Sequence, residues 1–327
     1  MILKRLSALA MSIRTFARRA RWKVMLRPRD RTVRKVKTLK AVRAASGCTY
    51  VEHPNVSMIV LSFNQVRNIA VLEPRLRATC AEELIVCEDG SIDGSHEEWM
   101  RRLIRPNDFL LHSNDLHEIR SYGRAIAYSR NEIVCLMQDD DQPPKDGRWL
   151  ADAVELFAEY PALAVLGGWC GFDDWFAVEY NAPWLPPGVG AIPFSDIRTS
   201  RPLVFVENVN IGPYLLRRRI FDELGGFDPR FSPPGETGIT FDAEYCYRAW
   251  RHGYQVALTD IPVKLETGRV GGGIFPGGTM MWGTEARERN ERANKQLIKE
   301  LYEDSLPAIR EAVRTANARL SRRSEVA

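Results

Sequence analysis

Residues 133–141 read IVCLMQDDD, a run of six mostly apolar, β-prone residues that leads directly into three carboxylates, Asp139, Asp140 and Asp141. Adjacent anions repel one another, so this triplet is unfavourable in isolation. A divalent cation would remove the repulsion, because Mg²⁺ and Mn²⁺ prefer oxygen ligands and commonly lie between carboxylates and substrate phosphates. The alternative is an acidic loop tip solvated by water. The position after a strand favours ligand binding, which open α/β sheets carry out at this edge.

The chain before this stretch alternates predicted strands and helices. Three further apolar runs predict strands: Met58–Leu61, Leu84–Cys87 and Phe109–Leu111. Residues 120–130 have a helical pattern, and we expect the helix after the first strand to break near Pro74, because proline disrupts helix interiors. Such alternation predicts a parallel sheet with right-handed crossovers. Polar clusters follow the strands, so they should converge on one cleft.

The second half of the chain is less regular. It has two helical patterns and four strand-like runs, at residues 148–159 and 240–252 and at residues 163–166, 203–206, 211–216 and 254–258. Residues 167–202 form a long loop rich in Trp, Pro and Gly, and a loop of this length in a compact domain is usually functional. Trp169, Trp175 and Trp184 could stack on a sugar or fill a core beneath the loop.

Cysteine usage and hydropathy limit the class of protein. The 327 residues include six cysteines without a C-x-x-C pair, which favours a reducing compartment and argues against a zinc site or a disulfide framework. No stretch approaches the roughly 18–20 apolar residues of a membrane-spanning helix, and no signal-peptide hydrophobic region is visible. We therefore expect a cytoplasmic protein.

Residues 1–48 form a basic arm. Residues 1–46 carry fifteen Lys or Arg and one acid, a net charge of +14, whereas the remainder carries −10. The apolar residues of the arm follow a helical 4-3-4-3-4 spacing: Ile2, Leu6, Leu9, Ile13, Phe16 and Ala20. Such a helix can lie on an anionic membrane, pack on the body or a second subunit, bind nucleic acid or act as a transit peptide. We favour a peripheral membrane contact and expect no nucleic-acid partner, because no aromatic platform accompanies the basic residues.

Four segments together resemble the family 2 glycosyltransferases. Residues 56–64 resemble the first strand of that family with its terminal Phe-Asn or Tyr-Asn, and residues 88–95 (EDGSIDGS) resemble its Asp-Asp-Gly-Ser segment. Residues 138–141 correspond to its Asp-x-Asp region, and residues 225–228 with 241–245 resemble its Gly-Gly-Phe-Asp and Glu-Asp motifs. The resemblance implies a GT-A fold, a mainly parallel Rossmann-like sheet flanked by helices, with a mixed acceptor-side half.

The resemblance also implies how a nucleotide-sugar donor would bind. The implied donor-binding residues are Ser62, Phe63, Asn64, Glu88, Asp89, Arg120, Asp139 and Asp140. Asp89 would accept a hydrogen bond from the imide N–H of the base, and the segment near Phe63 would pack on the base ring. Arg120 would lie near the nucleotide, or alternatively form a surface salt bridge with an acid such as Glu118. One or two carboxylates of Asp139–Asp141 would hold Mn²⁺ or Mg²⁺ against the diphosphate, and another would reach the ribose.

Asp242 is the implied general base, since transfer to a hydroxyl requires removal of the acceptor proton. Alternatively, its charge merely complements the dipole of the helix that begins there, and Glu244 could pair with Arg248 at i,i+4 spacing. Two positions depart from the family pattern. Phe241 replaces a usual Glu, and Gln138 replaces the first Asp of Asp-x-Asp, so the metal ligands must be chosen within the triplet.

The expected function is inverting, metal-dependent transfer of a sugar from a nucleotide sugar, with a UDP-sugar favoured, to a hydroxyl of a saccharide or lipid-linked acceptor. The alternative is a non-catalytic sugar-nucleotide-binding or scaffold subunit. The charged tail, residues 284–320, is either a packed appendage or a partner-binding segment. The expected parts are the arm (1–48), a donor-binding half (55–145), an acceptor half with the base (146–270) and a C-terminal extension (271–327).

Overall fold

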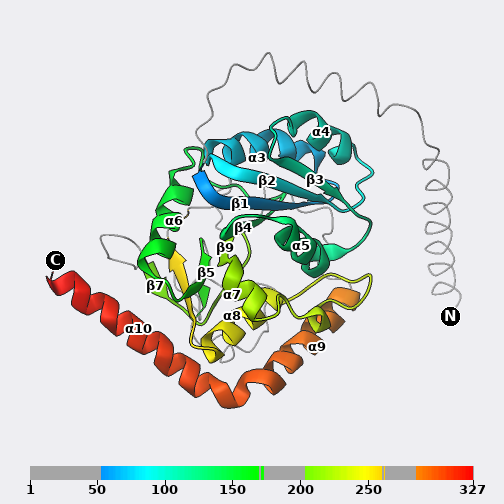
Figure 1. Cartoon of the computed structure of the whole chain (residues 1–327). Helices are drawn as coiled ribbons and strands as arrows, with labels where there is room; N and C mark the ends of the chain where they lie inside the picture. The colour runs from blue at the N-terminus through cyan, green and yellow to red at the C-terminus, as the bar shows by residue number, and fades with distance from the viewer. Residues whose placement is uncertain (1–52, 169–170, 173–202, 260, 262–284, 327) are drawn as a thin grey trace, which may run out of the picture. The chain divides into compact units, whose positions relative to one another are not determined.

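A computed structural model describes residues 53–168, 171–172, 203–259, 261 and 285–326. The predicted arm at residues 1–48 and the tryptophans at 169, 175 and 184 lie outside these ranges. The described residues form an eight-stranded sheet with the strand order β3-β2-β1-β4-β9-β5-β10-β7 (Figure 1). The elements of its first half are β1 (His53–Ser62), α3 (Val66–Ala78), β2 (Ala81–Glu88), α4 (Ser95–Arg102), β3 (Asp108–His112), α5 (His117–Tyr128) and β4 (Ile133–Gln138).

The first half is the parallel sheet that the sequence predicts. β1 pairs in parallel with both β2 and β4, and β2 pairs in parallel with β3. The apolar runs of β1, β2 and β4 are buried except for Leu61, because α3 and α4 cover one face of the sheet and α5 covers the other (Figure 1). The run Phe109–Leu111 in the edge strand β3 is only half-buried. In register, Ser62 at the end of β1 pairs with Glu88 at the end of β2. The residues that follow these strands therefore lie at one edge.

The predicted break at Pro74 is wrong, since α3 runs without interruption from Val66 to Ala78. Pro74 lies on the exposed side of the helix, and so does Ala70, whose carbonyl loses its usual hydrogen bond from position 74. Water can satisfy that carbonyl, while the opposite side of the helix remains packed through Ile69, Leu72 and Leu76. Burial of the apolar side therefore outweighs the local disruption.

The second half mixes strand directions, as expected. β9 is antiparallel to both β4 and β5, β10 is parallel to β5, and β7 is antiparallel to β10. A separate pair of strands, β6 and β8, lies beside this half. The elements are α6 (Arg148–Glu159), β5 (Leu163–Gly167), β6 (Gly171–Phe172), β7 (Leu203–Phe205), β8 (Asn208–Val209), β9 (Tyr214–Arg217), α7 (Arg218–Glu223), η3 (Pro229–Phe231), α8 (Phe241–Arg251) and β10 (Gln255–Thr259).

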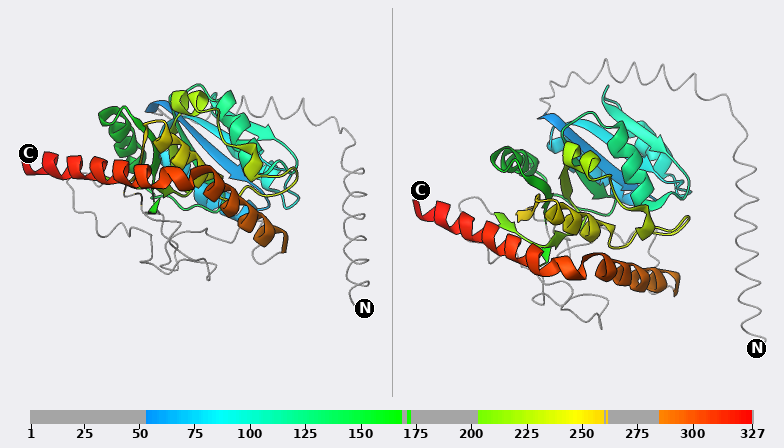
Figure 2. Two further views of the ribbon diagram at one scale, coloured as in Figure 1. Left: turned by 90° about the horizontal axis from the view of Figure 1, so that it is seen from below. Right: turned by 60° about the horizontal axis from the view of Figure 1, so that its bottom comes forward.

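The C-terminal extension packs on the body. It consists of α9 (Glu285–Tyr302), η4 (Glu303–Ser305) and α10 (Leu306–Val326), which follow one another along the α8 side (Figure 2). Its buried apolar residues are Ile298, Tyr302, Leu306, Ile309, Val313 and Ala316. The Asn317 side chain exchanges two hydrogen bonds of 2.8 Å with the backbone of Phe205 and so covers the edge strand β7. Of the two expected roles, the structure supports a packed appendage.

None of the helices in the described ranges is both long enough and apolar enough to cross a membrane.

Candidate functional site

The ends of β1, β2 and β4 meet at one edge of the sheet. The Asp89 N–H donates to the Ser62 carbonyl over 3.0 Å, and the Asp139 N–H donates to the Leu61 carbonyl over 2.9 Å. The Phe63 N–H in turn donates to Asp139 Oδ2 over 2.7 Å. The predicted convergence of these strand ends is therefore present in the structure.

Ser62 is buried and supports its neighbours. Its hydroxyl accepts a hydrogen bond from the Trp99 indole N–H over 2.9 Å and also bonds to the carboxyl group of Asp139. Because Ser62 has no exposed surface, these contacts make it a positioning residue for Asp139.

The turn after β1 is fixed by the loop after β2. Asn64 adopts a left-handed backbone with φ of 54°, which asparagine tolerates better than most residues. Its side-chain oxygen accepts from the Ile92 N–H over 2.8 Å, and its N–H donates to Ser91 Oγ over 2.9 Å. Asp93 Oδ2 accepts from the Val66 N–H over 2.9 Å. The half-buried ring of Phe63 thus projects from a rigid turn.

Asp89 is buried and holds the loop between β3 and α5. Its Oδ1 accepts from the Ser113 hydroxyl and the Leu116 N–H, and its Oδ2 accepts from the His117 N–H, each over 2.9 Å. The second lone pair of Oδ2 remains for a further donor. Asp89 is therefore a positioned acceptor, and its contact with a base stays a prediction.

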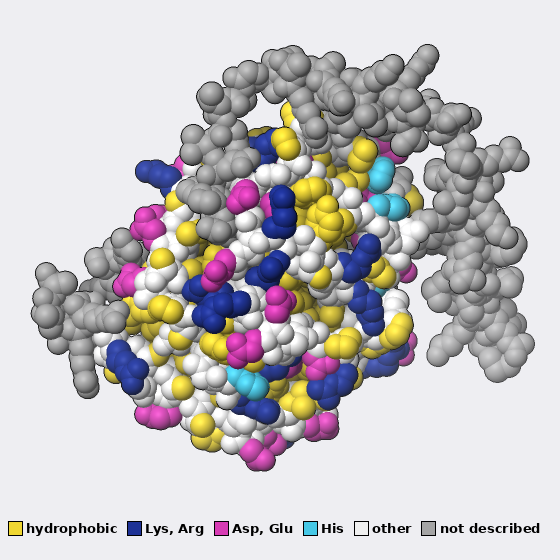
Figure 3. Space-filling model, in the orientation of Figure 1, with side chains coloured by type: hydrophobic (Ala, Val, Ile, Leu, Met, Phe, Trp, Pro, Cys, Tyr) yellow, Lys and Arg dark blue, Asp and Glu magenta, His cyan; other side chains and the backbone are white. Residues whose placement is uncertain are grey.

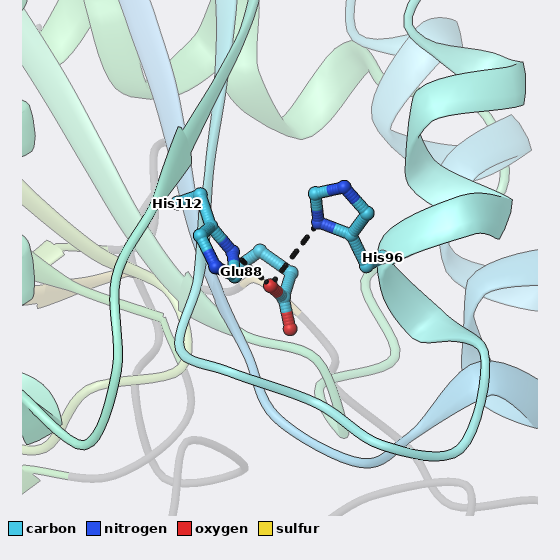
Figure 4. A group of neighbouring side chains, drawn as sticks. All are labelled: Glu88, His96 and His112. Atoms are coloured by element: carbon cyan, nitrogen blue, oxygen red, sulfur yellow. Dashed lines mark hydrogen bonds and ion pairs between the residues drawn. The ribbon is translucent and has the colours of Figure 1, made fainter. Parts of the chain in front are cut away.

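Glu88 faces away from Asp89, toward two histidines. Its Oε2 lies 2.6 Å from His112 Nδ1 and 3.3 Å from His96 Nδ1 (Figure 4). Neither histidine was predicted from the sequence. A signal was available for one of them, because His112 ends β3 as Glu88 ends β2, and the two pair in register.

The aspartate triplet forms a tight turn. The Gln138 N–H donates to Asp141 Oδ2 over 2.6 Å, and the Asp141 N–H donates to the Gln138 carbonyl over 3.2 Å. Asp139 and Asp141 are buried, and Asp140 is half-buried. Burial, and secondarily repulsion from Asp140, raise the pKa of both Asp139 and Asp141 well above the usual range. Clustered carboxylates of this kind suit a hard divalent cation, whose charge would stabilise their ionised forms.

The turn between β8 and β9 lies against the triplet. Gly212 has φ of 115°, and a Cβ at this position would lie only 2.6 Å from Asp141 Oδ1. Only glycine fits both the backbone conformation and this close approach.

Asp242 contacts the same turn. It lies in the first turn of α8, where its Oδ2 accepts from the Ile211 N–H over 3.3 Å and its Oδ1 from the Ala243 N–H over 2.9 Å. Burial raises the pKa of Asp242 to about 6, although these backbone hydrogen bonds act in the opposite direction. Since Ile211 adjoins Gly212, the triplet and the predicted base flank one short piece of backbone.

Arg120 is engaged by the loop before α8. Its guanidinium donates to the Ser232 carbonyl over 2.9 Å, while Glu118 Oε2 accepts from the Gly238 N–H over 2.8 Å. No ion pair joins Arg120 to Glu118 in the described structure, so that alternative is not supported. A contact between Arg120 and a nucleotide stays a prediction.

Packing explains why Phe241 stands where the family usually has a Glu. Phe241 is buried, and its ring meets the Phe227 ring edge-on at a centroid distance of 4.9 Å. Glu244 pairs with Arg248 at 2.8 Å, which confirms the i,i+4 alternative for Glu244. Asp242 is therefore the acid in this segment that faces the β8–β9 turn.

The sequence model of Glycosyl transferase family 2 matches residues 57–225, and the chain belongs to this family. The match includes the three strand ends and the triplet but stops before Asp242. The resemblance drawn from the motifs is confirmed, and the parallel half followed by a mixed half is the expected GT-A arrangement. A search of curated proteins found no match.

Solved structures that align with this chain include mannosyltransferase PcManGT from Pyrobaculum calidifontis in complex with GDP-Man and Mn²⁺, at 15% identity and a TM-score of 0.46. GalNAc-T7 with UDP, GalNAc and Mn²⁺ matches at 14% identity and a TM-score of 0.46. S. aureus TarS 1-349 matches at 19% identity and a TM-score of 0.44. The alignments cover 70%, 63% and 63% of this chain but 63%, 42% and 58% of the other chains. This chain thus spans less than two thirds of each of these proteins.

Proposed function

We propose that the protein transfers a sugar from a nucleotide sugar to a hydroxyl acceptor. One observation carries the proposal: Asp139–Asp141, at the meeting of three strand ends, and Asp242 flank the same Ile211–Gly212 turn. A cation-binding triplet beside a carboxyl group with a raised pKa is the pairing that glycosyl transfer needs. Membership of the family supports this function. The positions of Asp139–Asp141 and of Asp242 support the role that is proposed for each of them.

The donor is proposed to bind along the carboxyl edge of β1, β2 and β4. The half-buried Phe63 would pack on the base, and the remaining lone pair of Asp89 Oδ2 would accept from an imide N–H, which uracil carries and cytosine and adenine lack. Ser62 and Asn64 hold the surrounding turn. A UDP-sugar is therefore the proposed donor.

Mn²⁺ or Mg²⁺ is the proposed cofactor, with its ligands among Asp139, Asp140 and Asp141. When bound, the cation would supply Lewis-acid stabilisation of the charge on the departing nucleoside diphosphate. The chain itself contributes the orientation of the carboxylates, because Phe63 N–H fixes Asp139 and Gln138 N–H fixes Asp141.

Asp242 is the proposed general base. The acceptor oxygen attacks the anomeric carbon, its proton passes to an Asp242 carboxylate oxygen, and the bond from that carbon to the diphosphate oxygen breaks. One base and one displacement invert the configuration at the anomeric carbon. The Ile211 and Ala243 amides hold the carboxylate in place, while burial keeps it basic enough to accept the proton.

The acceptor is proposed to be a saccharide or a lipid-linked saccharide, and the basic arm is proposed to bind an anionic membrane on its cytoplasmic face. The arm lies outside the described residues, so its charge and spacing alone support this part.

The function can be tested by measuring nucleotide release from UDP-, GDP- and dTDP-sugars with Mn²⁺ and a panel of saccharide acceptors. We expect acceptor-dependent release, strongest with a UDP-sugar. The matched variant Asp242→Asn should bind nucleotide as the unmodified chain does but lose ~10²–10⁴-fold in transfer. Nucleotide binding without release from any donor would instead support a non-catalytic subunit, and normal turnover by Asp242→Asn would exclude this base.

A further inference from the structure

We propose a second metal site, for a transition metal such as Zn²⁺, formed by Glu88, His96 and His112. One ligand atom from each residue lies within 4.8 Å of the other two. Figure 4 shows both imidazoles turned toward the Glu88 carboxylate, with His112 Nδ1 at 2.6 Å and His96 Nδ1 at 3.3 Å from Oε2. Two histidines and one carboxylate are the protein ligands of several three-ligand zinc sites.

The fold brings the three residues together from three elements. Glu88 ends β2, His112 ends the adjacent β3, and His96 lies in the first turn of α4. Glu88 and His112 are register partners, and the Ser113 N–H donates to the Glu88 carbonyl over 2.9 Å. The sheet therefore fixes the separation of two ligands, and α4 adds the third.

The carboxylate is held in place by its surroundings. Glu88 has no exposed surface, and its Oε1 accepts from the Ser91 N–H over 2.6 Å, which leaves Oε2 toward the histidines. A hydrogen bond to the second oxygen of a ligating carboxylate is the usual way in which a protein orients a metal ligand. The site thus has a rigid inner ligand and two outer ones.

The outer ligands can adjust and leave an open position. Zinc–ligand bonds of ~2.0–2.2 Å in a tetrahedron place neighbouring ligand atoms roughly 3.3 Å apart. The contact to His96 already has that length, 3.3 Å, whereas the contact to His112 must open from 2.6 Å by about 0.7 Å. The His112 and His96 side chains are 51% and 35% exposed, so both can rotate and water can complete the coordination.

This site and the aspartate triplet would select different metals. The triplet offers only oxygen, which suits Mg²⁺ and Mn²⁺, whereas imidazole nitrogen suits Zn²⁺, Ni²⁺ and Cu²⁺. The cysteine spacing argues against a zinc site made of thiolates, but it does not bear on a site made of histidines. The two sites should therefore fill independently.

Metal at this site would fasten α4 to the β2–β3 edge. The segment between Glu88 and His96 contains Asp89 and also Ser91 and Asp93, which hold the turn after β1. Binding to the folded chain alone would raise its thermal stability through linkage. The expected effect is an increase in melting temperature with Zn²⁺ that does not require any donor or acceptor.

The test is calorimetric titration of the full chain with Zn²⁺ in excess Mg²⁺, repeated with Co²⁺ and followed by visible absorption. We expect His96→Ala and His112→Ala each to weaken Zn²⁺ binding by at least ~10-fold. Loss of a residue that only hydrogen-bonds to a metal ligand already has an effect of that size, and loss of the ligand itself should have no smaller one. His252→Ala, which removes an exposed histidine elsewhere, is the matched control and should bind as the unmodified chain does.

The outcomes separate the two sites. Asp139→Asn should leave the Zn²⁺ titration unchanged whether or not the transferase proposal holds. Circular dichroism of each variant checks folding, and Glu88→Gln, which keeps the shape of the side chain, should also weaken binding. The metal site is overturned if the full chain takes up no Zn²⁺ in excess Mg²⁺, or if the folded double variant His96→Ala/His112→Ala binds Zn²⁺ as tightly as the unmodified chain.

Discussion

The Asp242 carboxyl group gives the site a pH signature. Its pKa is raised to about 6 by burial, and only the ionised form can accept a proton from the acceptor. Transfer should therefore fall as the pH is lowered through about 6 and reach a plateau at higher pH. The kcat/KM profile against pH measures this, with nucleotide affinity at each pH as the control. A profile that stays flat through pH 6 would contradict the assignment.

The aspartate triplet should make nucleotide binding depend on metal. Replacing Asp140 or Asp141 with alanine removes an oxygen ligand beside the proposed diphosphate position, so added Mn²⁺ should no longer strengthen UDP binding. Titrations of UDP with and without Mn²⁺ measure the difference. Asp146→Ala, an exposed aspartate that pairs with Arg148, is the matched control. Equal Mn²⁺ enhancement in the triplet variants and in the control would rule out the metal role.

At the level of residues, positions that directly follow a strand could be predicted from the sequence. Asp89 and Asp139 were located because parallel strands end at one edge. The Glu88–His96–His112 cluster was missed because His96 comes from a helix, and the sequence does not show which turn of a helix faces a strand end. The contacts of Arg120 were missed for a similar reason, since Ser232 is far away in the chain.

Helix α9 supports the loop that leads into Asp242. Asn294 is buried, and its amide donates to the carbonyls of Phe231 and Ile239 over 2.9 and 2.8 Å. Asn294→Ala would remove both hydrogen bonds and leave the carbonyls of Phe231 and Ile239 with only the Ile239 N–H and the Thr240 hydroxyl as donors, at a cost of ~1–3 kcal/mol in the free energy of unfolding. Because the loop enters α8 directly, kcat should fall more than nucleotide affinity.

Denaturant unfolding and steady-state kinetics of Asn294→Ala measure both effects. Gln296→Ala, on an exposed position of the same helix, is the control and should change neither. If Asn294→Ala is as stable and active as Gln296→Ala, α9 does not support the loop.

The positions of strands and helices in the sequence were easier to predict than the order and direction of the strands in the sheet. Apolar runs located β1 to β5, because strands buried on both faces require them, although β3 at the edge of the sheet is only half-buried. Insertion of β9 between β4 and β5, and its reversed direction, were not predictable, since apolar runs carry no information about strand order. The Pro74 error has the same origin: a local rule was overridden by packing of the opposite side of the helix.

The C-terminal helices complete the core of the whole molecule. Tyr302 donates to Glu244 over 2.6 Å, and Arg310 pairs with Glu207 at 2.9 Å, so the extension supplies one partner to each of these buried carboxylates. A chain that ends at residue 284 should expose the apolar surface beneath these helices and aggregate. Size-exclusion chromatography and thermal melting check this, with a chain that ends at Leu320 as the control. A monomeric, fully stable chain ending at residue 284 would show that the extension is dispensable.

The distribution of charge supports the basic arm as the proposed membrane contact. On the face shown in Figure 3, basic and acidic side chains are intermingled, whereas the net +14 charge of residues 1–46 is concentrated in the sequence of the arm. Full-length protein should co-sediment with anionic vesicles, less so at high salt, and a chain starting at Thr49 should not. Equal sedimentation of the two chains would exclude the arm as the membrane contact.

The Ile211–Gly212 turn has a consequence for how such an enzyme could diversify. One peptide segment touches both the carboxylate proposed for the leaving-group side and the carboxylate proposed for the attacking side. The distance between the leaving group and the attacking hydroxyl is then set by main-chain geometry, which side-chain substitutions elsewhere hardly alter. Surfaces that recognise the acceptor could consequently change through evolution or engineering while the line of displacement stays the same.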